Sequence, residues 1–373
     1  MALHILTYGE IDRAEWGRLV RESETGTWFQ SQEAYGFYES LPELFRPFVV
    51  GVKSGELRVK SGELRGVCVG YVTKEKNPIK QFFTRRAIIL GGPVLADDAS
   101  SEEVELLMNG VNELMSERMN GAPIYIETRN FNDYSKWKGA FEKAGFAYKK
   151  HLNFHVDCRD EKKMWERLSD NRKRQIKKGT NGANDANGAN GENDVREWYG
   201  ILEKLYRTKV KTPLWPVEFF LEAYRQGVAK FLLVKHESKI IGGSMVVTNE
   251  RVKELRNEGV KELRSEGVKE LRSEGVNGGA VYEWFECGLN GDYKEQYPSV
   301  MATWGGMRWA HEHGCARYDM MGAGEPGVPY GVRDFKSEFG GTMVEHGRFL
   351  CVCKPWLYKI GEMGVKMMKE LRS

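Results

Sequence analysis

The stretch YDMMGAGEPGVPYGVRDFKSEFGGTMVEHGRFLCV, residues 318–352, decides the fold because three kinds of local structure follow one another within it. An apolar strand runs into a loop rich in glycine and proline, which lets the backbone approach a ligand closely. A short helix, Arg333–Gly341, comes next, and Thr342–Val352 then reads as a strand. Strand, loop, helix and strand together indicate an α/β unit.

The first half of the chain contains the same order of elements. The strand Ala122–Thr128, the amphipathic helix Ser135–Gly145 and the strand Phe146–Val156 match the three elements above. Three strands and a helix are expected before each set, so the order strand, strand, strand, helix, strand, helix, strand occurs twice. This is the order of GNAT-like domains. We therefore expect two of them, each a mixed, mostly antiparallel sheet flanked by helices.

The predicted domains are residues 1–158 and 159–373. In the first, the preceding elements are the strands Phe45–Val52, Gly66–Thr73 and Arg85–Leu95 and the helix Ser101–Asn120. In the second, they are the helices Lys162–Lys178, Val195–Lys209 and Pro216–Gln226, the strands Ala229–His236, Lys239–Asn249 and Ala280–Gly288, and the helix Ser299–His313.

Three biased segments interrupt this pattern. VKSGELR occurs twice between residues 52 and 65, VKELR(N/S)EG occurs three times within 252–276, and residues 180–194 are mostly Asn, Gly and Ala. The repeats have only Val and Leu as apolar residues, so they cannot build a core. We expect loop inserts, because lengthening a hairpin tip costs little entropy.

Composition excludes several classes of protein. The chain has 373 residues with 41% hydrophobic and 29% charged residues, which is typical of soluble globular proteins, and its length predicts two cores. It has no apolar run of about 20 residues and no signal-like start, so we expect a cytoplasmic protein. A net charge of +3 argues against a globally basic nucleic-acid binder. The six cysteines lack zinc-site spacing, and no metal site is expected.

The candidate site lies around the loop of the opening stretch. The strand brings Asp319 to its end, the glycines give flexibility, and the helix delivers charged residues on its first turn. The candidates are Asp319, Gly322, Gly324, Tyr330, Arg333, Phe335 and Lys336. The alternative is a turn followed by a solvated helix face. Because Lys336 is expected to lie outside the core, we expect its substitution to change stability little.

These motifs carry a family resemblance. The opening stretch, preceded by QYPSVMATWGGMRWAHEHG at 296–314, resembles the second-domain signature of the bacterial Fem family of aminoacyl-tRNA-dependent peptidyltransferases and its GNAT relatives. WERLSDNRKRQIKKG at 165–179 resembles the helix that opens that domain, and ILGGPVL at 89–95 resembles a strand of the first. Outside the inserts, the resemblance covers most of the chain.

The resemblance implies an activity and a site. It places Phe335 and Lys336 where a donor ester meets an acceptor amine, so Lys336 would stabilise negative charge on the attacked carbonyl. With Asp319 it forms the candidate catalytic pair. The donor would be aminoacyl-tRNA, with no tightly bound cofactor, and the acceptor a UDP-linked or lipid-linked muropeptide. The implied protein acts in peptidoglycan biosynthesis, with at most a peripheral association with the inner membrane.

Basic residues suggest further substrate contacts. The helix after Trp165 carries a run of cations that could bind a diphosphate or a tRNA backbone, although a solvated helix face is the alternative. A second basic segment precedes an aromatic one, and a tyrosine opens the helix after the third strand. The candidates are Arg172, Lys173, Arg174, Lys177, Lys211, Trp215 and Tyr297.

Two other functions remain open. A GNAT enzyme that uses acyl-CoA normally presents a glycine-rich turn at the helix after its third meander strand, where backbone N–H groups hold the pyrophosphate. The corresponding segments, ADDASSEE at 96–103 and DYKEQYPSV at 292–300, lack it. A non-catalytic binding protein is the third possibility.

Strict alternation along the strand 280–288 predicts that Glu283 and Glu286 lie on opposite faces, so that only one could face a cleft.

Overall fold

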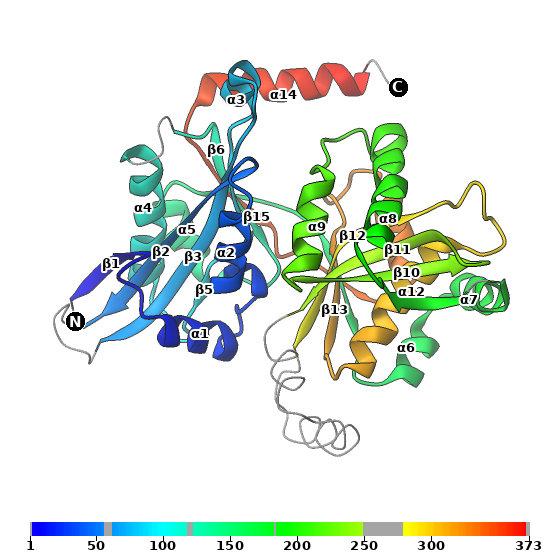
Figure 1. The fold of residues 1–373 in the computed structure, drawn as a ribbon. Coiled ribbons are helices and arrows are strands. Elements are labelled where there is room, and N and C mark those ends of the chain that lie inside the picture. Colours follow the sequence, from blue (N-terminus) through cyan, green and yellow to red (C-terminus); the bar gives the residue numbers. More distant parts are fainter. Residues whose placement is uncertain (1, 56–61, 118–121, 183, 249–278, 371–373) are drawn as a thin grey trace. The chain divides into compact units, whose positions relative to one another are not determined.

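The computed structural model describes residues 2–55, 62–117, 122–182, 184–248 and 279–370 (Figure 1). The chain forms two compact units, Met1–His151 with Glu345–Ser373, and Leu152–Val344. Each unit contains one mixed sheet flanked by helices, which confirms the predicted fold class. The repeat insert at 252–276 lies outside the described residues.

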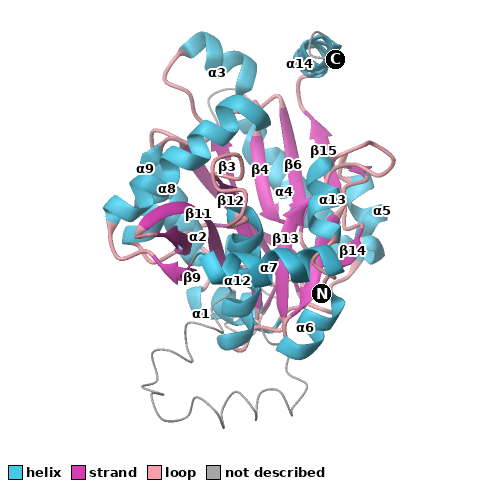
Figure 2. Ribbon diagram, turned by 90° about the vertical axis from the view of Figure 1, so that its right-hand side faces the viewer, coloured by secondary structure: helices cyan, strands magenta, loops and turns pink. Residues whose placement is uncertain are grey.

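The sheet of the first unit has the strand order β1-β2-β3-β4-β6-β15-β7, with β5 paired to β3. Within it, β4 and β6 are parallel and the other neighbours antiparallel, and β4, β6 and β15 lie side by side (Figure 2). Its strands are β1 (Leu3–Thr7), β2 (Phe45–Ser54), β3 (Glu63–Thr73), β4 (Ala87–Gly91), β5 (Val94–Leu95), β6 (Tyr125–Asn130), β7 (Ala147–Lys149) and β15 (Arg348–Val352). Its helices are α1 (Arg13–Glu22), η1 (Trp28–Gln30), α2 (Gln32–Glu39), α3 (Pro78–Thr84), α4 (Ser101–Glu117), η2 (Ser135–Trp137), α5 (Lys138–Lys143) and α14 (Pro355–Glu370).

The sheet of the second unit has the strand order β14-β8-β13-β12-β11-β10-β9, with β12 and β13 parallel. Its strands are β8 (Asn153–Asp157), β9 (Asn184–Gly188), β10 (Ala229–His236), β11 (Lys239–Thr248), β12 (Ala280–Gly288), β13 (Arg317–Gly322) and β14 (Thr342–Val344). Its helices are α6 (Glu161–Arg167), α7 (Asp170–Gly182), α8 (Glu192–Leu205), the π-helical turn η3 (Tyr206–Val210), α9 (Val217–Arg225), α12 (Pro298–Glu312) and α13 (Gly331–Ser337).

The closing strands are exchanged between the two halves of the sequence. Each of the two stretches predicted as one closing strand, Phe146–Val156 and Thr342–Val352, forms two strands in different sheets. The first part stays in its own unit, as β7 and β14. The second part enters the other sheet, where β8 pairs with β13 and β15 pairs with β6. The units therefore differ from the expected ranges 1–158 and 159–373, because local alternation does not specify which sheet a strand joins.

Three local expectations are also corrected. The Asn/Gly-rich stretch 180–194 is not a linker, since it contains β9, which pairs with β10 through backbone groups that any residue offers. The ends of the first repeat extend β2 and β3 to Ser54 and Glu63. The strand expected at 85–95 is broken into β4 and β5 after Gly91 and Gly92, whose φ angles are 84° and 78°.

The core of each unit lies between its sheet and its longest helix. In the second unit, α12 buries Met301, Trp304 and Met307 against the sheet, so this aromatic and methionine-rich helix is core, as predicted. In the first, α4 buries Leu107 and Val111 in the same way. Elements before Phe45 were not anticipated, and they cover the sheet with buried aromatic residues such as Trp16.

We expect that deleting residues 253–276 leaves the fold intact. Thr248 pairs with Val281 in the β11–β12 ladder, so the two strands that flank the insert already lie side by side, and a short loop can join them. Thermal unfolding of the deletion variant should match that of the full chain within a few degrees, by the usual scaling of small stability changes. A soluble but markedly less stable variant would show that the insert packs on the fold.

Truncation after Val344 should have the opposite effect. It removes β15, which pairs with both β6 and β7 and buries Phe349 in the core of the first unit. In the described sheet, β7 is joined to β6 only through β15, so without β15 the first unit should unfold or expose the edge of β6. Limited proteolysis of the truncated chain should digest residues 1–151 faster than in the full chain. Equal protection would contradict a structural role for the exchange.

Candidate functional site

The Lys336 side chain folds back from α13 onto the end of β13. Its ammonium Nζ donates to the carbonyl of Gly322 at 2.9 Å and also to the carbonyl of Met320, while the carbonyl of Met321 lies at 3.5 Å. Met321 has a left-handed φ of 58°, which turns the chain at this point. Lys336 is therefore bound to the loop rather than held on a solvated helix face.

Burial lowers the pKa of Lys336, and the nearby carboxylates of Glu283, Asp319 and Glu286 oppose this decrease. A single ammonium thus lies within electrostatic range of three acidic side chains from two neighbouring strands. Such a cluster of titratable groups at the ends of strands is a typical functional-site signature.

A bulge brings the two glutamates of β12 to the same face. Glu283 and Phe285 pair with consecutive residues of β11, so Trp284 is an extra residue on β12. The extra residue reverses the alternation of the side chains that follow it. Glu283 and Glu286 therefore both face α12, and our expectation of opposite faces is wrong. Trp284 faces α9, where its ring lies 5.2 Å from that of Phe219.

The two glutamates differ in their contacts. Glu283 is buried and its Oε1 accepts hydrogen bonds from Thr303 at 3.0 Å and from the Tyr318 hydroxyl at 2.8 Å. Glu286 is only partly buried, and its Oε1 has no hydrogen-bond partner among the described residues. Burial, and secondly the charge of Glu283, raise the pKa of Glu286 to about 8, against the opposing effects of Ser299 and Lys336.

Asp319 is fully buried and pairs with a histidine. Its Oδ2 lies 3.1 Å from Nε2 of His155 on β8, and its Oδ1 accepts the backbone N–H of Met321 at 2.7 Å. Burial raises its pKa, but His155 and Arg317 lower it more, so the net pKa is below the usual value. Asp319 thus fixes the turn that presents the carbonyls to Lys336, which makes it a positioning residue in this geometry.

Arg172 lies inside the unit, unlike the surface cation that we expected. Only 5% of it is exposed, and its guanidinium carbon is 4.4 Å and 4.9 Å from the ring centroids of Phe335 and Phe339. Its Nη2 donates to the Phe335 carbonyl at 3.2 Å, and Glu338 lies 3.7 Å from its Nε. The helical period explains the burial, because Arg172 shares the inward face of α7 with Ile176. Arg172 thereby fixes α13 beside the sheet.

The other basic candidates of α7 lie at its surface. Lys173 donates to the Glu166 carbonyl at 3.0 Å, whereas Arg174 and Lys177 are exposed. Lys177 lines an open groove of about 560 Å³ between α6, α7 and α12. Two tryptophan rings, Trp165 and Trp304, line it as well, and their centroids are 5.6 Å apart.

Arg333 and Tyr330 hold the Gly–Pro loop. Arg333 donates from Nε to the carbonyl of Ala323 at 2.9 Å and from Nη2 to the carbonyl of Glu325. Gly324 has a φ of 77°, and a Cβ there would lie 2.9 Å from the Tyr330 ring. The Arg333 donors are thus used within the loop, whereas Tyr330 is 42% exposed and can contact a substrate.

A basic segment begins next to this loop. Tyr206 opens η3 and packs on Phe285, with the ring centroids 6.3 Å apart. Burial, and then electrostatic contacts that include Tyr330 and Glu286, raise the pKa of Tyr206 to about 12. Exposed cations follow it directly along the chain: Arg207, Lys209 and Lys211. We call Arg207–Lys211 the basic lip.

The remaining predicted residues occupy the ends of helices. Lys211 has a left-handed φ of 56° and ends the basic lip, and the Trp215 ring stacks on Phe219 with centroids 6.0 Å apart. Tyr297 also has a positive φ, 48°, and precedes Pro298 at the start of α12. The structure thus brings Lys336, Asp319 and Tyr330 together with the basic lip in one unit.

Sequence reasoning missed three members of the site: Glu286, Tyr206 and His155. The bulge that turns Glu286 toward α12 has no simple signature, although two glutamates within an otherwise apolar strand were a signal. Tyr206 directly precedes the basic lip and could have been chosen for that reason. His155 was assigned to the first domain, so nothing linked it to Asp319.

Comparisons with known proteins bear on the family and the fold of the chain. Residues 276–365 match the model of the FemAB family. The crystal structure of FemX is similar, with a TM-score of 0.61 and 14% identity, over 96% of this chain and 99% of that chain. A conserved protein of unknown function from Bacteroides thetaiotaomicron has a TM-score of 0.51 and 9% identity, over 93% and 99%. A comparison with curated proteins gave no significant match.

The chain shares its overall α/β fold with FemX, and one segment of it matches the FemAB family. The chain is therefore FemAB-like, which confirms the resemblance inferred from its sequence. The matched segment contains β12, α12, β13 and α13, the elements that carry Glu286 and Lys336.

Two further findings concern the described part of the chain. It contains no group of three or more His, Cys, Asp or Glu side chains arranged to hold a metal ion. None of its helices combines the length and hydrophobicity that crossing a bilayer requires.

The contacts of Lys336 change what its substitution should do. Lys336→Met removes the donors that hold the carbonyls of Met320 and Gly322, so we expect a loss of roughly 1–3 kcal/mol in the free energy of unfolding, as for other unsatisfied buried groups. Urea denaturation measures this. Lys294→Met, at an exposed position of the same unit, is the control and should be neutral. Equal midpoints for both variants would contradict the anchoring role of Lys336.

Proposed function

We propose that this protein forms an amide bond by transferring an aminoacyl group from aminoacyl-tRNA to an amine of a cell-wall precursor, a UDP-linked or lipid-linked muropeptide, in the cytoplasm. The observation that carries the proposal is the placement of Lys336 and Glu286 together at the Gly–Pro loop, next to the basic lip. The FemAB match over this segment supports it. No tightly bound cofactor is needed, since the donor is already an activated ester.

The chemistry follows from the two charged groups. The amine nitrogen attacks the ester carbonyl carbon, a C–N bond forms, and the C–O bond to the ribose breaks. Two N–H donors of Lys336 are used by the carbonyls of Met320 and Gly322. The third has only the Met321 carbonyl, at 3.5 Å, as a long contact, and it can donate instead to the oxyanion that develops. Glu286 takes the proton that the amine loses and returns it to the departing ribose oxygen.

The raised pKa suits Glu286 to this task. An ordinary glutamate is a weak base, whereas a carboxylate with a pKa of about 8 is a stronger one and is still partly ionised near neutral pH. Its Oε1 is enclosed by the protein and has no hydrogen-bond partner among the described residues, so its capacity to accept a proton is not used by another side chain. The basic lip supplies positive charge for the tRNA backbone.

The alternative donor, acyl-CoA, fits less well at the start of α12. Its pyrophosphate would need the free backbone N–H groups of that first turn. Pro298 has no N–H, the Ser299 N–H donates to Asn290 Oδ1 at 3.1 Å, and the Met301 N–H donates to the Tyr297 carbonyl. The first turn therefore keeps few donors for a phosphate.

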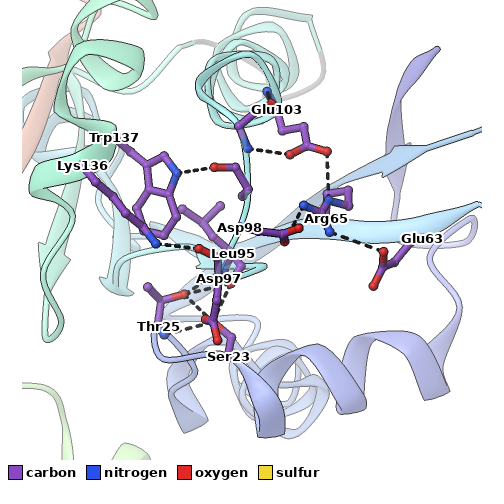
Figure 3. A network of polar contacts seen from close by, with 12 residues as sticks. Ser23, Thr25, Glu63, Arg65, Leu95, Asp97, Asp98, Glu103, Lys136 and Trp137 are labelled. Atoms are coloured by element: carbon purple, nitrogen blue, oxygen red, sulfur yellow. Dashed lines mark hydrogen bonds and ion pairs between the residues drawn. The ribbon is translucent and has the colours of Figure 1, made fainter. Parts of the chain in front are cut away.

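The start of the equivalent helix of the first unit, α4, is also unsuited to binding a pyrophosphate (Figure 3). At the start of α4, the Glu103 N–H donates to Ser100 Oγ at 3.2 Å, and the Ser100 N–H donates to Glu103 Oε2 at 2.7 Å. Arg65 bonds the carboxylates of Asp98 and Glu103 at 2.7 Å and 2.9 Å. This is a capping box with a neutralised carboxylate pair, and it leaves no site for a pyrophosphate.

Glu286→Gln should remove the base and lower the transfer rate by about 10² to 10⁴. In the unmodified protein, Glu286 becomes ionised as the pH rises through about 8, so the rate should rise over that range. The variant should lack this rise. Transfer of radiolabelled amino acid from mixed aminoacyl-tRNA to a UDP-muropeptide, measured between pH 6 and 9, tests both effects.

The matched control is Glu218→Gln, an exposed glutamate of α9, which should keep the full rate and the same pH profile. Parallel reactions with acetyl-CoA distinguish the donors. Transfer from acetyl-CoA alone would refute the proposed donor, and an unchanged pH profile in Glu286→Gln would refute the role of Glu286.

A further inference from the structure

Two helices of the first unit carry an exposed apolar surface that the proposed function does not use. α3 and α14 project from the same end of its sheet in Figures 1 and 2. They touch through Phe82 and Trp356, whose ring centroids are 6.0 Å apart. We define the α3–α14 surface by its exposed apolar residues: Ile79, Phe82, Phe83, Trp356, Ile360 and Met363.

These side chains are far more exposed than core residues. Ile79 is 71% exposed, Trp356 is 56% and Met363 is 60%. Single exposed apolar residues are ordinary, but a continuous group that includes three aromatic rings marks a binding surface in a folded protein. The group belongs to ordered helices, so it is presented in a fixed arrangement.

The first turn of α14 anchors the helix to the unit. Leu357 is buried, and the Tyr358 ring packs edge-on against Tyr125 with centroids 5.7 Å apart. Among the described side chains of α14, Trp356, Ile360 and Met363 follow the helical spacing of another face, and that face is exposed. α14 therefore presents an apolar stripe that the unit itself does not cover.

Basic side chains surround the stripe. The exposed lysines are Lys74, Lys76, Lys80 and Lys359. The ammonium of Lys354 lies 5.8 Å from the centroid of the Phe82 ring. Among the described side chains of the same two segments, the exposed acidic residues are Glu75 and Glu362.

We infer that the α3–α14 surface binds the anionic surface of a phospholipid bilayer. Aromatic rings and aliphatic side chains enter the boundary between headgroups and acyl chains, while lysines around them attract anionic headgroups. A second copy of this chain would bring the same lysines against one another, which is unfavourable. An anionic bilayer provides both apolar acyl chains for the aromatic and aliphatic side chains and negatively charged headgroups for the lysines. The surface deepens the proposed function, on which its relevance rests, by bringing the enzyme to a lipid-linked acceptor.

Sedimentation of the full chain with vesicles tests the inference. The protein should bind vesicles of equimolar phosphatidylcholine and phosphatidylglycerol, bind phosphatidylcholine vesicles much less, and lose affinity as salt rises. Phe82→Ser with Trp356→Ser should weaken binding about tenfold or more, because the apolar anchors are lost. Lys76→Glu with Lys80→Glu should weaken it about tenfold and reduce the salt dependence.

Matched controls use exposed residues of the second unit. Met343→Ser and Lys294→Glu, at exposed positions, should leave vesicle binding unchanged. The inference is overturned if the protein does not bind the vesicles or binds both lipid compositions equally. It is also overturned if the control substitutions weaken binding as much as the α3–α14 substitutions do. A Phe82/Trp356 variant that abolishes a dimer and leaves vesicle binding intact overturns it as well.

A second measurement separates this inference from the proposed function. The α3–α14 variants should transfer the aminoacyl group to a soluble UDP-linked acceptor at the unmodified rate. Transfer without vesicle binding refutes only the membrane surface. Vesicle binding without any transfer refutes only the proposed activity.

Discussion

Backbone pairing across the exchanged strands is the constraint on which the rest of the structure depends. In each unit the parallel pair at the centre, β4 with β6 or β12 with β13, needs a further strand, and the other half of the sequence supplies it. β8 pairs with β13 and places His155 3.1 Å from Asp319. The position of the Gly–Pro loop, and with it the bonds of Lys336, therefore depends on a strand whose His155 comes 164 residues before Asp319 in the chain.

The second determinant of the site is the bulge at Trp284. A regular strand would send Glu283 and Glu286 to opposite faces, and only one of them could lie near Lys336. The extra residue costs one position in the ladder, yet it turns both carboxylates toward α12 and both aromatic residues, Trp284 and Phe285, toward α9. One irregularity thus assembles an acidic cluster and a hydrophobic contact on the two faces of the same strand.

The sequence predicted most of the elements because hydrophobic periodicity is a local property. The order of strands and helices, the burial of Trp304 and the loop at Gly322 could all be obtained this way. Partnership between strands is non-local, so the exchange was not predicted, and neither was the pairing of His155 with Asp319. The bulge and the inward position of Arg172 depend on how elements pack. For the same reason, the run of basic residues predicted that α7 is positively charged but not which way each side chain points.

The exchange also sets an order of events during synthesis. A ribosome releases the chain from its N-terminus, and domains usually fold as their last strand emerges. The second unit has all its strands once Val344 has emerged. The first unit, although it begins at the N-terminus, still lacks β15 at that moment and exposes the edges of β6 and β7. Its sheet is completed only with the final residues, so the half that is made first is the half that closes last.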